Sequence, residues 1–168
     1  MMSENLNQKP KVATWVRIIS AFSSKKRLLF LKILFLLQRK KLHIDSNFTL
    51  GANCNLRSAG EIFFESYVSL ASNVVIETNL RLGRGTIVSS QVAFIGNDHS
   101  VIPGQSTKQP PNEKSFVNVG SNCWIGYATI IIGPVNICSD VIIGAGSIVT
   151  RSLEEPGVYI GAPARKIR

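Results

Sequence analysis

The chain has 168 residues, of which 45% are hydrophobic and 17% charged, so it is long enough to bury one core and little more. The whole net charge of +9 lies in residues 1–42, which contain ten Lys or Arg and one acidic residue, while residues 43–168 contain nine charges of each sign. This neutral remainder argues against a nucleic-acid-binding fold, because such a fold carries a basic face of its own.

The basic N-terminal segment is predicted to be helical over residues 12–42. Ser23 or Ser24 is a candidate cap for a helix that begins just after them. Residues 28–37 are apolar except Lys32, but ten residues are about half of what a membrane span needs. A signal peptide is disfavoured, because no small-residue cleavage site follows and a basic flank lies on the C-terminal side.

Two interpretations of this helical segment remain open. In the first, the helix packs on the open end of the domain that follows, or on a neighbouring subunit. In the second, residues 12–42 lie on an anionic membrane surface, where lysines near the headgroups contribute about 1 kcal/mol each.

From Ile44 onward, an apolar residue recurs at every sixth position, with a slip of two residues near Gly60 and one long interruption. A period of six fits neither a helix nor an alternating strand. A unit of six residues is too small to bury its own apolar face and becomes stable only when it is stacked. The recurring positions are Ile44, Leu50, Leu56, Phe64, Leu70, Ile76, Leu82, Val88, Phe94, Val119, Ile125, Ile131, Ile137, Ile143 and Val149.

Each hexad has room for a short strand and a turn, so three hexads make a triangular coil whose neighbours are joined by parallel hydrogen bonds. Fifteen recurring positions therefore predict about five coils, with these side chains pointing into a prism. The slip near Gly60 predicts a bulge or a short loop. Small or medium residues four places further on are also expected to point inward, namely Val68, Val74, Leu80, Val92, Cys123, Thr129, Val135, Val141 and Ser147.

The repeat stops at Gly96 and resumes at Val119, and residues 96–118 are rich in Pro, Ser, Asn and Gln. Such an insertion must leave a stacked solenoid as a surface loop, and long loops in compact domains usually carry function. His99 lies near the start of this loop. The other histidine, His43, directly precedes the first coil, where a solvent-exposed or capping role is expected.

The three cysteines, Cys54, Cys123 and Cys138, make an odd count without CxxC spacing. Because Cys54 and Cys123 fall at inward positions, we expect reduced core residues in a cytosolic protein. No metal site is expected, since two histidines do not supply a zinc ligand set. No G-x-G-x-x-G motif follows a strand, which argues against a dinucleotide-binding unit.

The repeats at 119–150, the Trp-Ile-Gly motif at 124–126 and the C-terminal Gly-Ala-Pro-Ala-Arg at 161–165 resemble the hexapeptide-repeat acyltransferases. The resemblance covers residues 44–168. It implies an all-β fold, a left-handed parallel β-helix of about five coils with a short N-terminal helical segment and a protruding loop. It also implies a homotrimer, an active site between two subunits and acetyl-CoA as the co-substrate.

The organisation that follows from this resemblance has three parts. Residues 1–42 form the basic, apolar N-terminal helical segment. Residues 43–155 form the β-helix, with an active-site loop at 96–118. Residues 156–168 form a C-terminal tail that contacts coenzyme A (CoA).

By this resemblance, His99 is the catalytic base. Histidine can take the proton of a sugar hydroxyl as its oxygen attacks the thioester, and return that proton to the CoA thiolate. A main-chain N–H around Gly126 and Tyr127 is the expected donor to the oxyanion. A loop carbonyl, or a carboxylate such as Asp98 or Glu77, would orient His99. The candidates for contact with the acceptor are Glu77, Asn97 and Asp98.

The same resemblance implies a row of residues along bound CoA. Tyr127 stands where the family often has Ser or Ala, and Ala162 stands where it usually has Asn. Arginine in the tail suits the phosphates of CoA, because a guanidinium forms paired hydrogen bonds with phosphate oxygens. The candidate CoA contacts are Trp124, Gly126, Tyr127, Ala145, Thr150, Arg151, Arg165 and Arg168.

In function, the resemblance implies an O-acetyltransferase for a bacterial surface glycan, such as capsule or lipopolysaccharide, or for its lipid-linked precursor. We expect a cytoplasmic protein, or one held on the inner face of the cytoplasmic membrane through residues 12–42, with no nucleic-acid partner. Two alternatives remain: a non-catalytic β-helix scaffold, and an acetyltransferase for a small sugar or an amino acid. The presence of His99 and Trp124 favours catalysis over a scaffold.

Overall fold

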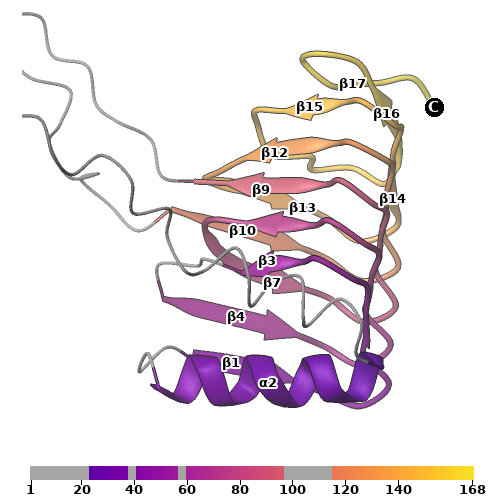
Figure 1. Ribbon diagram of the computed structural model, residues 1–168. Helices are drawn as coiled ribbons and strands as arrows, with labels where there is room; N and C mark the ends of the chain where they lie inside the picture. The colour runs from indigo at the N-terminus through magenta and orange to yellow at the C-terminus, as the bar shows by residue number, and fades with distance from the viewer. Residues whose placement is uncertain (1–22, 38–40, 57–59, 97–114) are drawn as a thin grey trace, which may run out of the picture.

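The computed structural model describes residues 23–37, 41–56, 60–96 and 115–168. Within these ranges, helix α2 (Ser24–Leu37) is followed by short strands that form the three sides of a prism (Figure 1). Sheet A contains β1 (Lys41–Ile44), β4 (Glu61–Phe64), β7 (Asn79–Leu82), β10 (Phe116–Val119) and β13 (Val135–Ile137). Sheet B contains β2 (Thr49–Leu50), β5 (Ser69–Leu70), β8 (Ile87–Val88), β11 (Trp124–Ile125), β14 (Val141–Ile143), β16 (Gly157–Ile160) and β17 (Arg165–Lys166). Sheet C contains β3 (Asn55–Leu56), β6 (Val75–Ile76), β9 (Ala93–Ile95), β12 (Ile130–Ile132) and β15 (Ile148–Val149).

The chain visits sheets A, B and C in turn, so each circuit adds one coil to the stack. The fold is the left-handed parallel β-helix of about five coils that the resemblance implies. Register fixes the coil length: Phe64 pairs with Leu82, 18 residues on, whereas Ile44 pairs with Phe64, 20 residues on. The first coil therefore contains the two extra residues that the sequence predicts. Residues 57–59, where the slip falls, lie outside the described residues.

The interior of the prism is filled by the apolar side chains that the six-residue repeat predicts to point inward. Fourteen of the fifteen recurring positions are buried, and Ile44, in the first coil, is half-buried against the same core. All nine smaller residues predicted to point inward are buried as well. The buried hydroxyls among them bond to the main chain, as in Ser147 Oγ to Gly144 O at 2.7 Å. The hexad pattern is thus confirmed side chain by side chain.

Two of the three corners turn through residues with positive φ, which Gly and Asn adopt most easily. The A–B corner uses Asn47, Tyr67, Gly85, Asn122 and Asp140, and the B–C corner uses Asn53, Asn73, Gln91, Ala128 and Gly146. Stacked corners are joined by main-chain hydrogen bonds, such as Gly146 N to Tyr127 O at 2.8 Å. The C–A corner has no such residue in the described ranges, and the interruption of the repeat falls at this corner, between β9 and β10.

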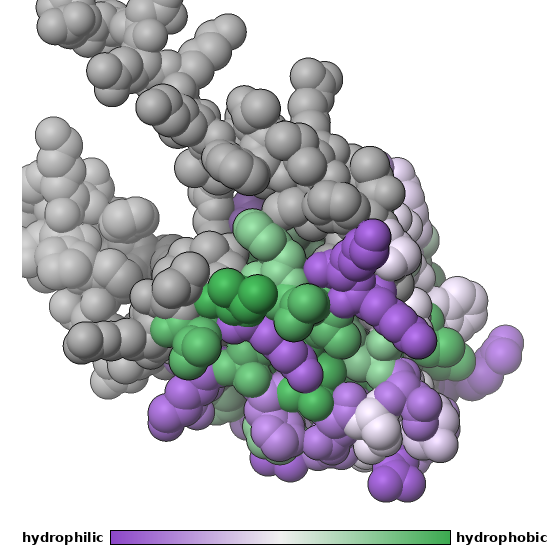
Figure 2. Space-filling model, turned by 60° about the horizontal axis from the view of Figure 1, so that its bottom comes forward, coloured by the Kyte–Doolittle hydropathy of each residue, from purple (hydrophilic) through white to green (hydrophobic). Residues whose placement is uncertain are grey.

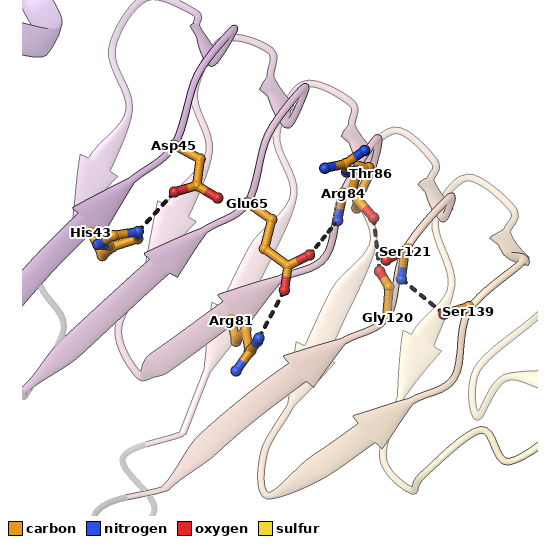
Figure 3. A network of polar contacts seen from close by, with 9 residues as sticks. All are labelled: His43, Asp45, Glu65, Arg81, Arg84, Thr86, Gly120, Ser121 and Ser139. Atoms are coloured by element: carbon orange, nitrogen blue, oxygen red, sulfur yellow. Dashed lines mark hydrogen bonds and ion pairs between the residues drawn. The ribbon is translucent and has the colours of Figure 1, made fainter.

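The outer face of sheet A is held by a polar and aromatic ladder that includes His43 (Figure 3). The His43 ring stacks on Phe63 with 4.2 Å between centroids, and its Nε2 lies 2.8 Å from Asp45 Oδ1. The Arg81 guanidinium lies 4.9 Å from the Phe63 centroid and donates to Glu65 at 2.8 Å, which lowers the pKa of that carboxyl. His43 is therefore a surface packing residue, in agreement with the solvent-exposed or capping role predicted for it.

Both ends of the prism are covered. Helix α2 lies across the N-terminal end and contacts β1 and β2 (Figure 1). This position agrees with the first interpretation of the N-terminal segment. At the other end, β16 pairs in parallel with β14, and β17 turns back antiparallel onto β16.

Substituting the neighbouring residues Phe63 and Phe64 one at a time tests which side chains of β4 point into the core and which point outward. Phe64 is fully buried, so Phe64→Ala should lower the free energy of unfolding by about 3–5 kcal/mol. Phe63→Ala removes only outer stacking and should cost about 0.5–1.5 kcal/mol. Guanidinium chloride unfolding at one protein concentration measures both values. Equal losses for the two variants would contradict the assigned orientation of β4.

Candidate active site

The interruption that contains His99, Asn97 and Asp98 lies outside the described residues over 97–114. Its two ends are fixed at the C–A corner. Thr78 Oγ1 donates to Ser115 O at 2.9 Å, and Gly133 N donates to Ile95 O at 2.7 Å. The corner is crowded: a Cβ on Gly96 would lie 2.3 Å from Thr78 Oγ1, so only glycine fits at this position.

Glu77 lies beside this base of the interruption. Its N–H donates to Phe94 O at 2.8 Å, which places Glu77 one coil below β9. Because Ile76 and Thr78 on either side are buried, the alternation of the strand directs the half-buried Glu77 side chain to the outer face. Among the candidate acceptor contacts, Glu77 is the one that the described residues include, and it lies next to the base of the interruption.

The Trp-Ile-Gly motif forms β11 and the turn that follows it. Trp124 is 52% exposed on the outer face of sheet B, and its Nε1 donates to Ser89 Oγ at 3.1 Å. Trp124 therefore lines the outer surface, as expected, while Ile125 fills the core. The outer neighbours of Trp124 in register, Ile87 and Ile142, are 51% and 38% exposed, so an apolar row runs along this sheet.

The turn after β11 presents one main-chain donor. Gly126 N is engaged, since it donates to Ile143 O at 2.8 Å. Gly126 is also required for close stacking, because a Cβ there would lie 2.6 Å from Ile143 O. Within the described residues, no main-chain partner is found for the N–H of Tyr127, whose side chain is half-exposed. The oxyanion donor is predicted to be a main-chain N–H around Gly126 and Tyr127, and of these two the Tyr127 N–H is the one left without a main-chain partner in the described residues.

The B–C corner forms an edge of candidate CoA contacts. Ala145 is exposed one coil above Tyr127, and the hydrogen bond from Gly146 N to Tyr127 O joins the two turns. The C-terminal tail passes over the same corner, where Gly161 N donates to Ser147 Oγ at 3.2 Å. We call the edge made by Trp124, Gly126, Tyr127, Ala145 and Arg165 the B–C edge.

The three cations of the tail are not equivalent. Lys166 Nζ lies 2.6 Å from Glu155 Oε2, and this pair raises the pKa of Lys166 and lowers that of Glu155. Arg165 Nη1 donates to the main-chain oxygen of Ala164 at 3.0 Å. Neither Arg165 nor Arg168 has a carboxylate partner among the described residues, and both are exposed. These two arginines are the cations left to bind an anion.

Thr150 and Arg151 lie elsewhere. They follow β15 at the C–A corner, two coils above the base of the interruption, and both are exposed. The structure therefore divides the candidate residues between two edges of the prism, separated by sheet C. One is the B–C edge, and the other carries Thr150, Arg151 and Glu77.

The cysteines show no sign of a nucleophile. Cys123 is buried and Cys54 and Cys138 are half-buried, all three with free thiols. Burial is the main cause that raises the pKa of the Cys123 thiol, and also that of Cys138. A raised pKa lowers the fraction of reactive thiolate. Within the described ranges, no group of three His, Cys, Asp or Glu side chains is placed to hold a metal ion.

No family model matches the chain. The chain is 30% identical over 139 residues to an Escherichia coli K12 protein assigned as the lipopolysaccharide biosynthesis O-acetyl transferase WbbJ, a match that covers 76% of this chain and 71% of the relative. It is 33% identical over 115 residues to the galactoside O-acetyltransferase of the same strain, a match that covers 61% of this chain and 57% of that relative.

A solved structure has the same fold. It is a hexapeptide-repeat-containing acetyltransferase from Vibrio cholerae O1 biovar eltor, complexed with acetyl-CoA. The TM-score is 0.73 at 18% sequence identity, and the match covers 93% of this chain and 84% of that chain.

Proposed function

Since the chain belongs to the hexapeptide-repeat acyltransferases, we propose that it transfers an acetyl group from acetyl-CoA to a hydroxyl of a bacterial surface glycan or of its precursor. The observation that carries this proposal is the 30% identity, over 71% of the relative's length, to an O-acetyl transferase assigned to lipopolysaccharide biosynthesis. The galactoside O-acetyltransferase supports the same acceptor chemistry, a sugar hydroxyl. The acetyl-CoA complex of the Vibrio cholerae protein supports the donor.

The donor is proposed to lie along the B–C edge. The pantetheine arm would run past Trp124, Gly126, Tyr127 and Ala145, which the stacking of coils places on one line. Arg165 and Arg168 would bind the phosphates, because Lys166 is already paired with Glu155 and the two arginines are not paired with a carboxylate in the described part of the chain. Guanidinium groups suit this task through paired hydrogen bonds to phosphate oxygens.

The acetyl transfer is proposed to use His99 as the general base. His99 takes the proton from the acceptor hydroxyl while the hydroxyl oxygen forms a bond to the thioester carbon. The carbonyl oxygen becomes an oxyanion, which accepts a hydrogen bond from the Tyr127 N–H, since the Gly126 N–H is engaged by Ile143 O. The carbon–sulfur bond then breaks, and His99 returns the proton to the CoA thiolate. Glu77, at the base of the interruption, is the proposed carboxylate that orients His99.

A homotrimer would complete this site. The base of the interruption lies at the C–A corner, and the B–C edge lies across sheet C from it. Packing the C–A corner of one copy against the B–C edge of the next brings the two sets of residues together. Repeating this contact around a three-fold axis closes a ring. The exposed apolar row of Ile87, Trp124 and Ile142 on sheet B supports such side-by-side packing. Thr150 and Arg151 would then contact the CoA of a neighbouring copy.

A second candidate acceptor is a small sugar. The match to a galactoside O-acetyltransferase favours it over an amino acid. Acetyl transfer assayed against polymeric, lipid-linked and small glycosides distinguishes the two acceptor classes. A protein that binds acetyl-CoA, yet acetylates none of these acceptors, would instead be a non-catalytic scaffold.

His99→Ala should lower kcat by about 10²–10⁴-fold, the effect expected on loss of a general base. Affinity for acetyl-CoA should change little, because the proposed donor contacts lie on the B–C edge. Steady-state acetyl transfer measures the first effect, and the shift of melting temperature with acetyl-CoA measures the second. A variant that keeps more than a third of the activity would assign the base to another residue.

Arg165→Ala should raise KM for acetyl-CoA by about 10- to 150-fold, the loss of one charged hydrogen bond. The matched control is Lys166→Ala, which removes a cation already paired with Glu155 and should change KM far less. The Arg165→Ala effect should shrink with acetyl-pantetheine, which lacks the nucleotide phosphates. Equal KM values for the two variants would remove Arg165 from the phosphate site.

Sedimentation equilibrium should give a mass of three times the 18.4 kDa of one chain. A three-fold ring is expected because the proposed site draws residues from two edges of the prism. The measurement is repeated over a dilution series together with the acetyl-transfer assay. A monomer that remains active on dilution would contradict both the trimer and the shared site.

A further inference from the structure

Helix α2 carries apolar side chains on its outer side as well as toward the prism. Leu28 and Phe30 are half-buried at the end of the β-helix. Leu29, Ile33 and Leu36 are 61%, 48% and 77% exposed. Their spacing of four and three residues puts these three on one stripe of the helix. Figure 2, which looks at this end of the molecule, shows hydrophobic surface gathered beside hydrophilic surface. We call Leu29, Ile33 and Leu36 the outer stripe.

Cations border this stripe on both sides. With about 100° between successive residues, Lys25 and Lys32 lie within about 60° of Leu29 on one side and Lys26 lies about 60° away on the other. All three lysines are exposed, and α2 contains no acidic residue. An exposed apolar stripe edged by lysines offers the two contributions by which a helix binds an anionic membrane surface, which are apolar area to bury and positive charge.

Helix stability does not account for these lysines. Lys25 and Lys26 lie in the first turn, where the helix dipole favours acidic residues, and the last turn of α2 has no basic residue. Lys25 and Lys26 thus lie at the end of α2 where the helix dipole disfavours positive charge. An anionic surface facing the outer stripe would attract lysines at its border, such as Lys25 and Lys32, toward its lipids.

The helix is not a membrane span. In the described ranges, no helix reaches the length and hydropathy that a crossing requires. At 14 residues, α2 is about 21 Å long, shorter than the roughly 30 Å hydrocarbon core. It lies across the end of the prism rather than along the direction in which the coils stack (Figure 1).

We propose that the outer stripe docks on an anionic lipid bilayer and stands the prism on its N-terminal end. The bilayer would then face the end covered by α2, with the coils rising away from it. The base of the interruption lies in the third coil, since sheet A runs β1, β4, β7 in order. Two coil-to-coil spacings of about 4.8 Å, added to the diameter of α2, put the base of the interruption about 15–20 Å above the lipid.

This height identifies the acceptor class, a step that rests on the function proposed above. A glycan attached to a lipid at the bilayer surface can reach this height with a few sugar rings. The proposed acceptor is therefore the lipid-linked form of the glycan rather than the free polymer.

Flotation of the full chain with vesicles tests the docking. The wild type should bind vesicles of phosphatidylcholine with phosphatidylglycerol and bind pure phosphatidylcholine far more weakly, with the difference reduced by salt. The double variant Leu29→Glu with Leu36→Glu should bind the anionic vesicles at least about tenfold more weakly, because it removes buried apolar area and adds negative charge. The matched control is Ile167→Glu, which places a charge on an exposed isoleucine at the opposite end of the prism.

A second variant, which replaces lysines of α2, tests the docking even if the glutamates introduced at Leu29 and Leu36 disturb folding. The double variant Lys25→Gln with Lys32→Gln changes exposed side chains and should lower binding to anionic vesicles while leaving the melting temperature unchanged. Equal flotation of wild type and both variants would overturn the proposal and leave another segment of the chain to cover the stripe. A change in sedimentation mass without a change in flotation would overturn it in favour of a second copy.

The acceptor class has a separate readout. With galactosyl diacylglycerol in the vesicles, the Leu29→Glu and Leu36→Glu variant should lose activity, and with soluble methyl galactoside it should keep it. Loss of activity on both acceptors would overturn the proposal that the outer stripe acts by positioning the protein at the membrane. If the wild type acetylates neither probe, the acceptor proposal fails for galactosides, while the flotation result still decides the docking.

Discussion

The constraint on which the structure depends is that each coil must stack its inward side chains directly on those of the next. The interior is a column of side chains from Leu50 to Val149. Register partners above the first coil are 18 residues apart where the repeat is unbroken, as Ile62 with Leu80 and Val117 with Val135, 37 apart across the interruption and 16 apart at the last coil. A single coil could not bury this surface alone, so its stability comes from its neighbours. Residues that bind ligands or take part in a reaction can therefore lie only at outward positions, at corners or in segments outside the repeat.

This constraint explains how much of the fold the sequence could predict. The hexads identify the buried positions because a residue that faces the axis must be apolar or, like Thr129, bonded to the main chain. The two-residue slip reappears as the 20-residue register of the first coil. The direction of the outer stripe could not be predicted, because the run from Leu28 to Leu37 is apolar at every position except Lys32 and only the packed helix shows which side is outermost.

For the candidate site, the sequence proposes residues but says little about how they are arranged in space. An 18-residue spacing marks residues that share an edge where the repeat is unbroken, and it relates Tyr127 to Ala145. The same count would have separated Thr150 and Arg151 from that edge. Two other features needed coordinates: the Gly126 N–H is consumed by Ile143 O, and Lys166 is paired with Glu155. Both depend on segments brought together by stacking, which local sequence does not encode.

The way in which the two ends of the prism are covered bears on how the protein could attach to a membrane. A solenoid needs a cover at each end, and here α2 provides one and the β16–β17 hairpin the other. If three copies pack side by side around an axis parallel to the stack, all three α2 helices lie at the same end. Their outer stripes then face one plane, so a bilayer engages three weak sites at once. Linked sites of this kind bind with an avidity that can exceed a single site by about 10²–10⁴-fold. The same symmetry that completes the proposed active site would therefore make a short helix, unable to span a membrane, sufficient to hold the protein on one.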